Sequence, residues 1–465
     1  MEDVITDNEE VANDESDAEE SDNEEVQFEN SDSEQGISDT EEGDVSASNS
    51  LSFVGKNGVT YWKKHSHVPK TVRTRAENIV KKFPSPKLST RSLKEAKEIW
   101  EYFINKDMIN LIVEFTNQYI QSIVHKFERP RDATTTDALE IRALLGLLYL
   151  AGLYHANRMN VEEFWKTDGS GIEIFRLTMS LQRFRFLLRC LRFDDKNSRE
   201  ERRATDKLAA IRTFFDSFVN NCQNGYNHSE YVTVDEMLPG FRGRCSFRQY
   251  IPSKPNKYGI KIYALADAYM YYTSRMEVYV GKQPAGPFNL STSTKDLVLR
   301  LTDNIRTTGR NLTIDNWFTS IPLVEELMTK PNKMTVIGTI KKNKAELPLE
   351  FTKPEVRPEC TSMFGFRPTC TLVSYIPKKK KNVLLVSSLH KSDEIDDKTG
   401  EKRKPSIVTE YNQTKCGVDV VDKLCASYNC SRNTRRWPMV IFYTLLNIAG
   451  INSQVIHTTT QIKNF

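Results

Sequence analysis

Apolar residues recur every three or four positions between about residues 92 and 227. The clearest runs are Met108, Ile112, Phe115 and Tyr119, then Leu181, Phe184, Leu188 and Leu191, then Leu208, Ile211, Phe215 and Phe218. This spacing places the apolar side chains on one face of a helix. Asp137 and Glu140 resemble a capping box before the apolar run at residues 143–154, which is too short to cross a bilayer. The pattern predicts a bundle of amphipathic helices.

From residue 231 the period changes to two, and β-branched and aromatic residues appear in short runs. The candidate strands are residues 231–234, 260–266, 276–280, 311–314 and 334–340, with helices at 294–306 and 321–329. Three consecutive strands followed by alternating helices and strands predict a meander beside parallel crossover units. This is the order of an RNase H-like core. We therefore expect an α/β core with a mixed sheet and flanking helices, joined to an all-α part.

The remaining segments differ from these two patterns in composition. Residues 1–85 have too few apolar side chains to offset the loss of chain entropy, so we expect disorder there. Residues 341–405 contain short strands and polar loops, which indicate a small β-rich insertion. The expected units are disordered 1–85, helical 86–230, α/β 231–340, insertion 341–405, α/β again over 406–428 and helical again over 429–465.

Charge is distributed very unevenly along the chain. Residues 1–44 hold 20 Asp and Glu and no Lys, Arg or His, whereas the remaining 42 acids face all 65 Lys and Arg. The part after residue 44 therefore has a formal charge of about +23, and a large basic protein most often binds nucleic acid. Membrane surfaces are a weaker alternative, and we expect no membrane association. The acidic start is unlike a signal peptide, so we expect an intracellular protein.

The cysteines give no indication of a structural metal site. The eight cysteines contain no Cys-x-x-Cys pair, and the seven histidines do not cluster with them. We expect reduced thiols and no zinc site.

Four acids lie at positions suited to metal chemistry. Asp235 follows the strand YVTV, Asp315 follows the strand NLTI, and Asp419 and Asp422 share one helix face. Carboxylates brought close together repel unless cations lie between them, and oxygen ligands favour Mg²⁺ or Mn²⁺. Two such ions support in-line displacement at phosphorus. Taken alone, the helix pair also fits a solvated face, Asp315 also fits an Asx turn, and the spacing of the acids fits many folds.

Basic residues interleaved with aromatic ones follow Asp235 closely. The predicted DNA-binding residues are Arg242, Arg244, Arg248, Lys254, Lys257 and Lys261, together with Arg432, Arg435 and Arg436 before a helix start. Their alternative is a solvated sheet face or helix end. Trp317 is interpreted as a packing residue that fixes the loop of Asp315, and the lysines at residues 378–381 as a hairpin tip, although they also resemble a nuclear localisation signal.

Three sequence blocks resemble the piggyBac transposase family, within a similarity that covers roughly residues 90–460. They are VDEMLPGFRGRCSFRQYIPSKPNKYGIKIYALAD at residues 234–267, LTIDNWFTSIPL at 312–323 and YNQTKCGVDVVDKL at 411–424. The resemblance implies that Asp235, Asp315 and Asp419 are catalytic metal ligands, with Asp422 as a neighbouring acid of the metal site. It also implies a homodimeric nuclear enzyme that cuts double-stranded DNA at transposon ends and joins it to TTAA targets. The helical units would bind DNA and dimerise.

Two features depart from the family pattern. The family usually continues into a cysteine-rich, zinc-binding module that recognises transposon ends, and this sequence stops at Phe465 without such cysteines. Cys416 stands where the family commonly has a glycine, which is tolerated unless that position needs a positive φ. Two expectations follow: an active transposase, or a domesticated or truncated transposase-derived protein that binds DNA or chromatin without transposition.

Overall fold

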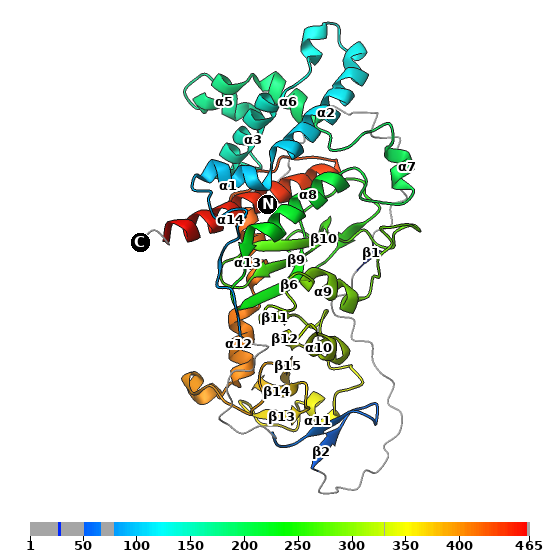
Figure 1. Ribbon diagram of the computed structural model, residues 1–465, viewed down its shortest axis with the longest axis vertical. Coiled ribbons are helices and arrows are strands. Elements are labelled where there is room, and N and C mark those ends of the chain that lie inside the picture. Colours follow the sequence, from blue (N-terminus) through cyan, green and yellow to red (C-terminus); the bar gives the residue numbers. More distant parts are fainter. Residues whose placement is uncertain (1–26, 29–50, 67–78, 330, 463–465) are drawn as a thin grey trace, which may run out of the picture.

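The computed structural model describes residues 27–28, 51–66, 79–329 and 331–462. The molecule is elongated, with a cluster of helices at one end and a long twisted sheet that runs through the rest (Figure 1). Two large apolar cores correspond to these parts, since one joins the helices to the first strands of the sheet and the other lies along the sheet.

The helical end matches the predicted bundle. In chain order its helices are α1 (Ala96–Phe103), α2 (Lys106–Ile123), α3 (Ala138–Leu153), α4 (Val161–Trp165), α5 (Glu173–Thr178), α6 (Leu181–Cys190), α7 (Arg199–Arg203) and α8 (Arg212–Gly225), with the 3-10 turns η3 (Val124–Lys126) and η4 (Pro130–Ala133). The predicted cap is present, because the Asp137 carboxylate accepts a hydrogen bond from the backbone N–H of Glu140 at 2.8 Å.

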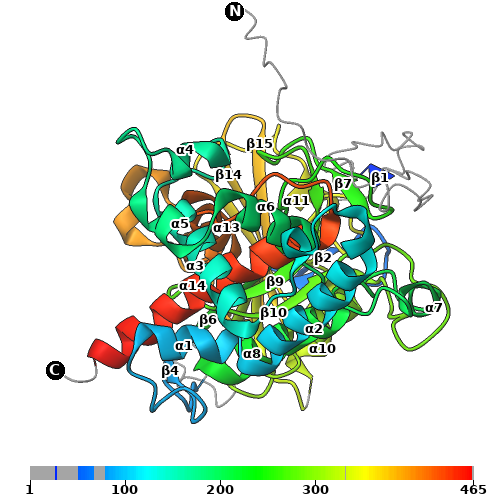
Figure 2. The same cartoon turned by 90° about the horizontal axis from the view of Figure 1, so that it is seen from above.

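Helix α14 (Trp437–Ile462) lies across the junction between the helical end and the sheet (Figures 1 and 2). It packs against α1, α8 and α13, so residues from the end of the sequence share a core with the first helices. Among the described residues, α14 alone is long and apolar enough to cross a membrane. However, 78% of its most apolar stretch is buried inside the protein, as in a core helix.

In the described part of the chain the main sheet has the strand order β10-β9-β6-β11-β12-β15-β14-β13-β3-β2. These strands are β2 (Ser52–Val54), β3 (Tyr61–Lys63), β6 (Tyr231–Met237), β9 (Ile262–Asp267), β10 (Thr273–Val278), β11 (Asn311–Ile314), β12 (Thr335–Thr339), β13 (Ser362–Phe366), β14 (Thr371–Lys378) and β15 (Lys381–Ser387). β10, β9 and β6 form an antiparallel meander, and β6, β11 and β12 are parallel. The predicted strand order is confirmed and is consistent with an RNase H-like core.

Helices cover both faces of this sheet near its parallel strands (Figure 1). They are α9 (Thr294–Thr302) and α10 (Ile321–Met328) on one face, and α12 (Ser406–Thr414) and α13 (Gly417–Ser427) on the other, with α11 (Leu349–Thr352) and the 3-10 turn η5 (Asp397–Lys402) farther along. Val232 and Val234 share an apolar cluster with α9 and α10, whereas Thr233 faces α12. Side chains therefore alternate between the faces along β6, as the period of two requires.

Small sheets lie beside the main one. They contain β1 (Gln27–Phe28), β7 (Arg248–Tyr250) and β8 (Tyr258–Ile260) in one group, and β4 (Ser85–Pro86) with β5 (Tyr226–Asn227) in another. β7 and β8 form an antiparallel pair, with Arg248 in β7 and two of the predicted DNA-binding lysines in the loop between the strands.

The expectation of disorder over residues 1–85 was wrong for residues 51–66. This segment forms the hairpin β2–β3, which extends the main sheet through β13, and Trp62 is completely buried with its indole N–H donating to the carbonyl of Glu346. Burial of one large aromatic side chain and pairing with a distant strand supply the stability that composition alone does not indicate. The remainder of residues 1–85 lies largely outside the described residues.

The segment predicted as an insertion, residues 341–405, continues the central sheet, because β15 pairs antiparallel with β12. Its lysine-rich stretch is a hairpin tip: β14 ends at Lys378, β15 begins at Lys381, and Lys380 has a φ of 63°. The hairpin interpretation of residues 378–381 is therefore confirmed.

Candidate active site

Strand register brings the first two acids together. In the parallel pair β6 and β11, Thr233 lies beside Thr313 and Val234 beside Ile314, so the next residues in register are Asp235 and Asp315. Neighbouring strands are about 4.8 Å apart, which makes adjacent carboxylates close neighbours at the carboxyl end of the strands.

The helix acids are brought to the same place by the junction between α12 and α13. The Thr233 hydroxyl donates to the carbonyl of Thr414 at 2.7 Å, and the hydroxyls of Thr313 and Thr414 are 2.8 Å apart. Gly417 begins α13 so close to β6 that an added Cβ would lie 2.6 Å from the Thr233 hydroxyl oxygen. Because both strands bond to one residue at this junction, the position of α13 is set relative to the two strand acids.

Asp235 and Asp315 lie in a setting that favours their protonated forms. Burial is the largest cause that raises the pKa of Asp235 well above its usual value, followed by the charge and hydrogen bond of Glu236 and the charge of Asp315. Burial and the charge of Glu236 also raise the pKa of Asp315, although hydrogen bonds from two backbone N–H groups partly offset this. Two half-buried carboxylates whose charge is offset only in part by nearby lysines are the arrangement that a bound cation stabilises.

The two helix acids differ from each other. Burial raises the pKa of Asp422, whereas the Asp419 side chain is 59% exposed. Asp419 lies in the first turn of α13, where the helix dipole favours a negative charge.

Lys254, one of the predicted DNA-binding residues, lies among these acids. Its ammonium Nζ is 3.5 Å from Glu236 Oε1 and 4.0 Å from Asp419 Oδ1, and it donates to the carbonyl of Glu236 at 3.2 Å. Burial alone would lower the pKa of Lys254, but Glu236 and Asp235, with smaller contributions from the helix acids, raise it.

Three residues that the sequence patterns did not single out also lie close to the acids. Glu236 influences both strand acids, Lys341 partly offsets the raised pKa of Asp315, and burial together with the charges of both strand acids raises the pKa of Tyr411 to about 12. Of these three residues, only Lys341 could have been predicted from its position, because it lies just after the third parallel strand, β12.

The Asx turn considered for Asp315 is present, since its Oδ1 accepts from the N–H groups of Trp317 at 2.9 Å and Phe318 at 3.3 Å. Trp317 stacks on Tyr263 with ring centroids 5.5 Å apart, which confirms its interpretation as a packing residue. The turn orients the carboxylate and does not remove it from the site, because only one of its oxygens takes part in these bonds.

Some of the predicted DNA-binding arginines gather on one exposed surface. A Cβ added to Gly243 would lie 2.5 Å from the carbonyl of Arg435, so these two distant segments are in contact. Arg242, Arg244 and Arg435 are exposed there, and Lys257 is exposed on the nearby loop between β7 and β8. We call the first three the arginine surface.

The other predicted DNA-binding residues make internal contacts. Arg248 donates to the carbonyls of Arg242 and Gly243, and Lys261 is 1% exposed and lies over aromatic rings that include Trp317 at 5.1 Å. Both side chains thus contact other parts of the protein.

Arg432 and Arg436 are likewise used within the fold. Arg432 donates to the carbonyls of Ala156 and Met159, and Arg436 to those of Leu188, Arg189 and Leu191. For these residues the structure shows a role in holding the helices together, and their contact with DNA stays a prediction.

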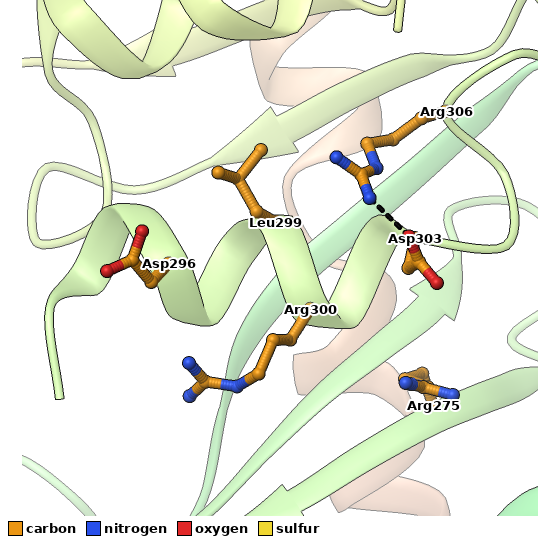
Figure 3. Close-up of a pocket in the computed structure, with 6 residues that line it drawn as sticks. All are labelled: Arg275, Asp296, Leu299, Arg300, Asp303 and Arg306. Carbon is orange, nitrogen blue, oxygen red and sulfur yellow. Dashed lines mark hydrogen bonds and ion pairs between the residues drawn. The ribbon is translucent and has the colours of Figure 1, made fainter. Parts of the chain in front are cut away.

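A surface groove of about 290 Å³ lies elsewhere, beside α9 and β10 (Figure 3). Its lining residues are Arg275, Asp296, Leu299, Arg300, Asp303 and Arg306. Arg306 pairs with Asp303, and Arg300 makes two hydrogen bonds to Glu277. None of the four predicted metal-site acids lines this groove, so it is separate from the site.

Comparison with known proteins is consistent with this arrangement. The family described as Transposase IS4 matches residues 95–454. The human piggyBac transposable element-derived protein 3 is 23% identical over an aligned 385 residues, and the human chimeric ERCC6-PGBD3 protein is equally similar. Each alignment covers 75% of this chain, and the chain spans 59% and 33% of the lengths of these relatives, respectively.

A cryo-EM structure of a piggyBac transposase synaptic complex with hairpin DNA has the same fold, with a TM-score of 0.77 and 37% sequence identity. The similarity covers 82% of this chain and 79% of that one. The position where the family commonly has glycine also permits cysteine, because Cys416 has a φ of −89°. The chain therefore belongs to the piggyBac family of DDE-type transposases.

Proposed function

We propose that this protein is a metal-dependent DNA transposase that cleaves DNA strands at transposon ends and joins them to TTAA targets. The observation that carries the proposal is the register of β6 and β11, which makes Asp235 and Asp315 neighbours beside the first turn of α13. Family membership supplies the reaction class, and the hairpin DNA in the similar synaptic complex supports DNA, which we take to be double-stranded, as the partner.

The donor set fits Mg²⁺ or Mn²⁺ in its chemistry. All four predicted ligands, Asp235, Asp315, Asp419 and Asp422, offer carboxylate oxygens, which hard divalent ions prefer. Within the residues that the structure describes, no three His, Cys, Asp or Glu side chains lie close enough to hold an ion as they stand. The exposed Asp419 carboxylate is paired with Lys254, so it would have to turn toward the strand acids to complete the site.

Bound divalent ions would activate the attacking oxygen and stabilise the leaving oxygen during in-line displacement at phosphorus. The protein's own contribution is to hold carboxylates on two rigid strands and one helix, and to shield the strand pair partly from water. Asp315 is further oriented by its turn, and Trp317 packs that turn against Tyr263. Rigid placement of this kind is worth large factors in rate, because small displacements of reacting groups are costly.

The test is Mg²⁺-dependent cleavage of DNA that carries candidate transposon ends next to TTAA. The parent protein should cut, and Asp315→Asn should lose far more than the roughly 10–100-fold expected for a supporting group. Asp303→Asn is the matched control, since it removes a carboxylate that is 63% exposed and outside the site. Cleavage by Asp315→Asn at the parent rate would refute the proposed role of this acid.

A second candidate is a non-catalytic DNA-binding or chromatin protein derived from a transposon. It is favoured by the similarity to a human protein described as transposable element-derived. If neither the parent nor Asp315→Asn cuts DNA in the same assay while both bind it, this candidate replaces the first.

Adjacent arginines provide a separate test of DNA binding. Arg435 belongs to the exposed arginine surface, so Arg435→Gln should weaken DNA binding. The slope of the logarithm of the association constant against the logarithm of the salt concentration should become shallower by about one, and the free energy of unfolding should not change. Arg436 donates hydrogen bonds to three carbonyls, so Arg436→Gln should lower the free energy of unfolding by about 1–3 kcal/mol.

A nuclear location and a homodimer are parts of the same proposal. Microscopy of a tagged chain tests the location, and light scattering tests the oligomeric state.

A further inference from the structure

Lys254 belongs to the basic segment that we predicted to bind DNA, yet its ammonium lies among the acids of the site. Its ammonium faces Glu236 from the strand side of the site and Asp419 from the helix side, at 3.5 Å and 4.0 Å. It also interacts electrostatically with Asp235 and Asp422. The side chain is only 19% exposed, so much of it lies within the protein instead of extending into solvent.

The loop that carries Lys254 is held in place by local contacts. The backbone N–H of Lys254 donates to the carbonyl of Ile251 at 3.2 Å, and the N–H of Ile251 donates to the carbonyl of Lys257 at 2.9 Å. At the loop's other side, Asn256 packs so tightly on Gly240 that an added Cβ would lie 2.8 Å from its side chain. The lysine therefore extends toward the acids from a turn that is fixed by hydrogen bonds and close packing.

The electrostatics of the site call for a cation at this point. Buried or partly buried carboxylates gathered without a positive charge repel one another, and the repulsion is strongest where water is excluded. Lys254 bridges the two sides of the site, because it contacts one acid in β6 and one acid on α13. Exposed Lys257, three residues later on the same loop, has no such position.

We propose that Lys254 is a built-in counter-ion of the metal site. This inference rests on the proposed metal-dependent function. In the metal-free protein its ammonium holds Asp419 and Glu236 together across the site, and it competes with divalent cations for the same carboxylates. When metal binds, the ammonium is displaced from Asp419 and becomes available to the phosphate backbone of the DNA substrate. Lys254 is thus a positioning residue whose partner changes between the metal-free and metal-bound states.

The competition predicts a gain in metal affinity when the charge is removed. Lys254→Met keeps the length and the apolar stem of the side chain, so Mn²⁺ should bind the full chain about tenfold more tightly, while the metal-free melting temperature falls. Lys254→Arg retains the charge and should bind Mn²⁺ as the parent does. Lys257→Met removes one charge from the exposed part of the loop and should leave both quantities unchanged.

The readouts are the dissociation constant for Mn²⁺, measured by electron paramagnetic resonance without DNA, and the melting temperature with and without Mn²⁺. If Lys254→Met binds Mn²⁺ no more tightly than the parent, the inference is overturned, whatever happens to stability. If Lys254→Met and the parent bind Mn²⁺ equally and Asp315→Asn abolishes this binding, the proposed function still holds. If the parent binds no Mn²⁺ at this site, so that Asp315→Asn changes nothing, the proposed function and the inference both fail.

Discussion

The acids on the strand side of the site and those on the helix side are held in different ways. Asp235 lies within β6 and Asp315 directly follows β11, the register of these strands is fixed by backbone hydrogen bonds, and both side chains are at least half-buried. Asp419 is mostly exposed and lies on a helix that reaches the sheet through side-chain contacts and one close glycine. The strand side is therefore assembled by folding itself, whereas the helix side depends on a few specific contacts that single substitutions can break.

The largest effect is expected at Gly417, which allows α13 to approach β6. Gly417→Ala would place a Cβ 2.6 Å from the Thr233 hydroxyl oxygen, forcing the helix away and lowering the free energy of unfolding by about 1–3 kcal/mol. Displacement of Asp419 by about 1 Å should reduce metal-dependent cleavage on the order of a hundredfold. Thermal denaturation and the cleavage assay measure the two effects.

Gly146 supplies the control for this substitution. It lies inside α3, and an added Cβ would meet nothing within 4 Å, so Gly146→Ala should stabilise by up to about 1 kcal/mol and leave cleavage unchanged. Parent-like cleavage by Gly417→Ala would show that the close helix approach is not required for the site.

The strand side was predictable from sequence, and the helix side only in part. Alternating apolar residues locate β6 and β11, and the rule that functional groups collect at the carboxyl ends of parallel strands brings Asp235 and Asp315 together. The i and i+3 spacing places Asp419 and Asp422 on one face of α13, but which way that face turns depends on packing between residues about 180 positions apart, such as Thr233 and Thr414.

The basic residues show the limit of composition as a guide. Lys254, Lys261 and Arg436 look like DNA contacts because of their charge, yet each has protein partners that are distant in sequence. Likewise, the hairpin at residues 51–66 is stabilised by pairing with β13, some 300 residues away, and no local pattern reports such a partner. What the sequence conveys here is the local period, and it locates each strand only to within a few residues, since β6 continues to Met237 although we predicted its end at residue 234.

A smaller effect is expected from the hydroxyl that joins β6 to α12. Thr233→Val keeps the shape of the side chain but removes the donor to the buried carbonyl of Thr414, at a cost of about 1–3 kcal/mol. Cleavage should fall less than in Gly417→Ala, because the helix keeps its close contact with the strand. Chemical denaturation and the cleavage assay check this prediction.

Thr313→Val is the matched change on β11 and should cost less. It removes the contact with the Thr414 hydroxyl, but that hydroxyl retains its hydrogen bond to the carbonyl of Glu410 at 2.9 Å. Equal or reversed costs for the two valine variants would mean that the junction is not held mainly through β6.

The smallest effect is expected in the melting temperature of the metal-free protein, where replacing Asp235 and replacing the exposed Asp419 should have different consequences. The raised pKa of Asp235 means that the folded chain keeps this proton to higher pH than the unfolded chain does. Metal-free stability therefore falls as pH rises from the unfolded value through the raised folded value. Above that window Asp235→Asn should melt a few degrees higher than the parent, and below the unfolded pKa the gain should disappear.

Asp419→Asn provides the contrast, because an exposed carboxylate 4.0 Å from one ammonium contributes little to stability. Its melting temperature should stay within about 1 °C of the parent across the same pH range. Melting curves between pH 3 and 8 in the presence of a chelator measure both variants. If the melting temperatures of the two asparagine variants change alike with pH, burial does not destabilise the charged form of Asp235. The two sides of the site would then differ in geometry alone.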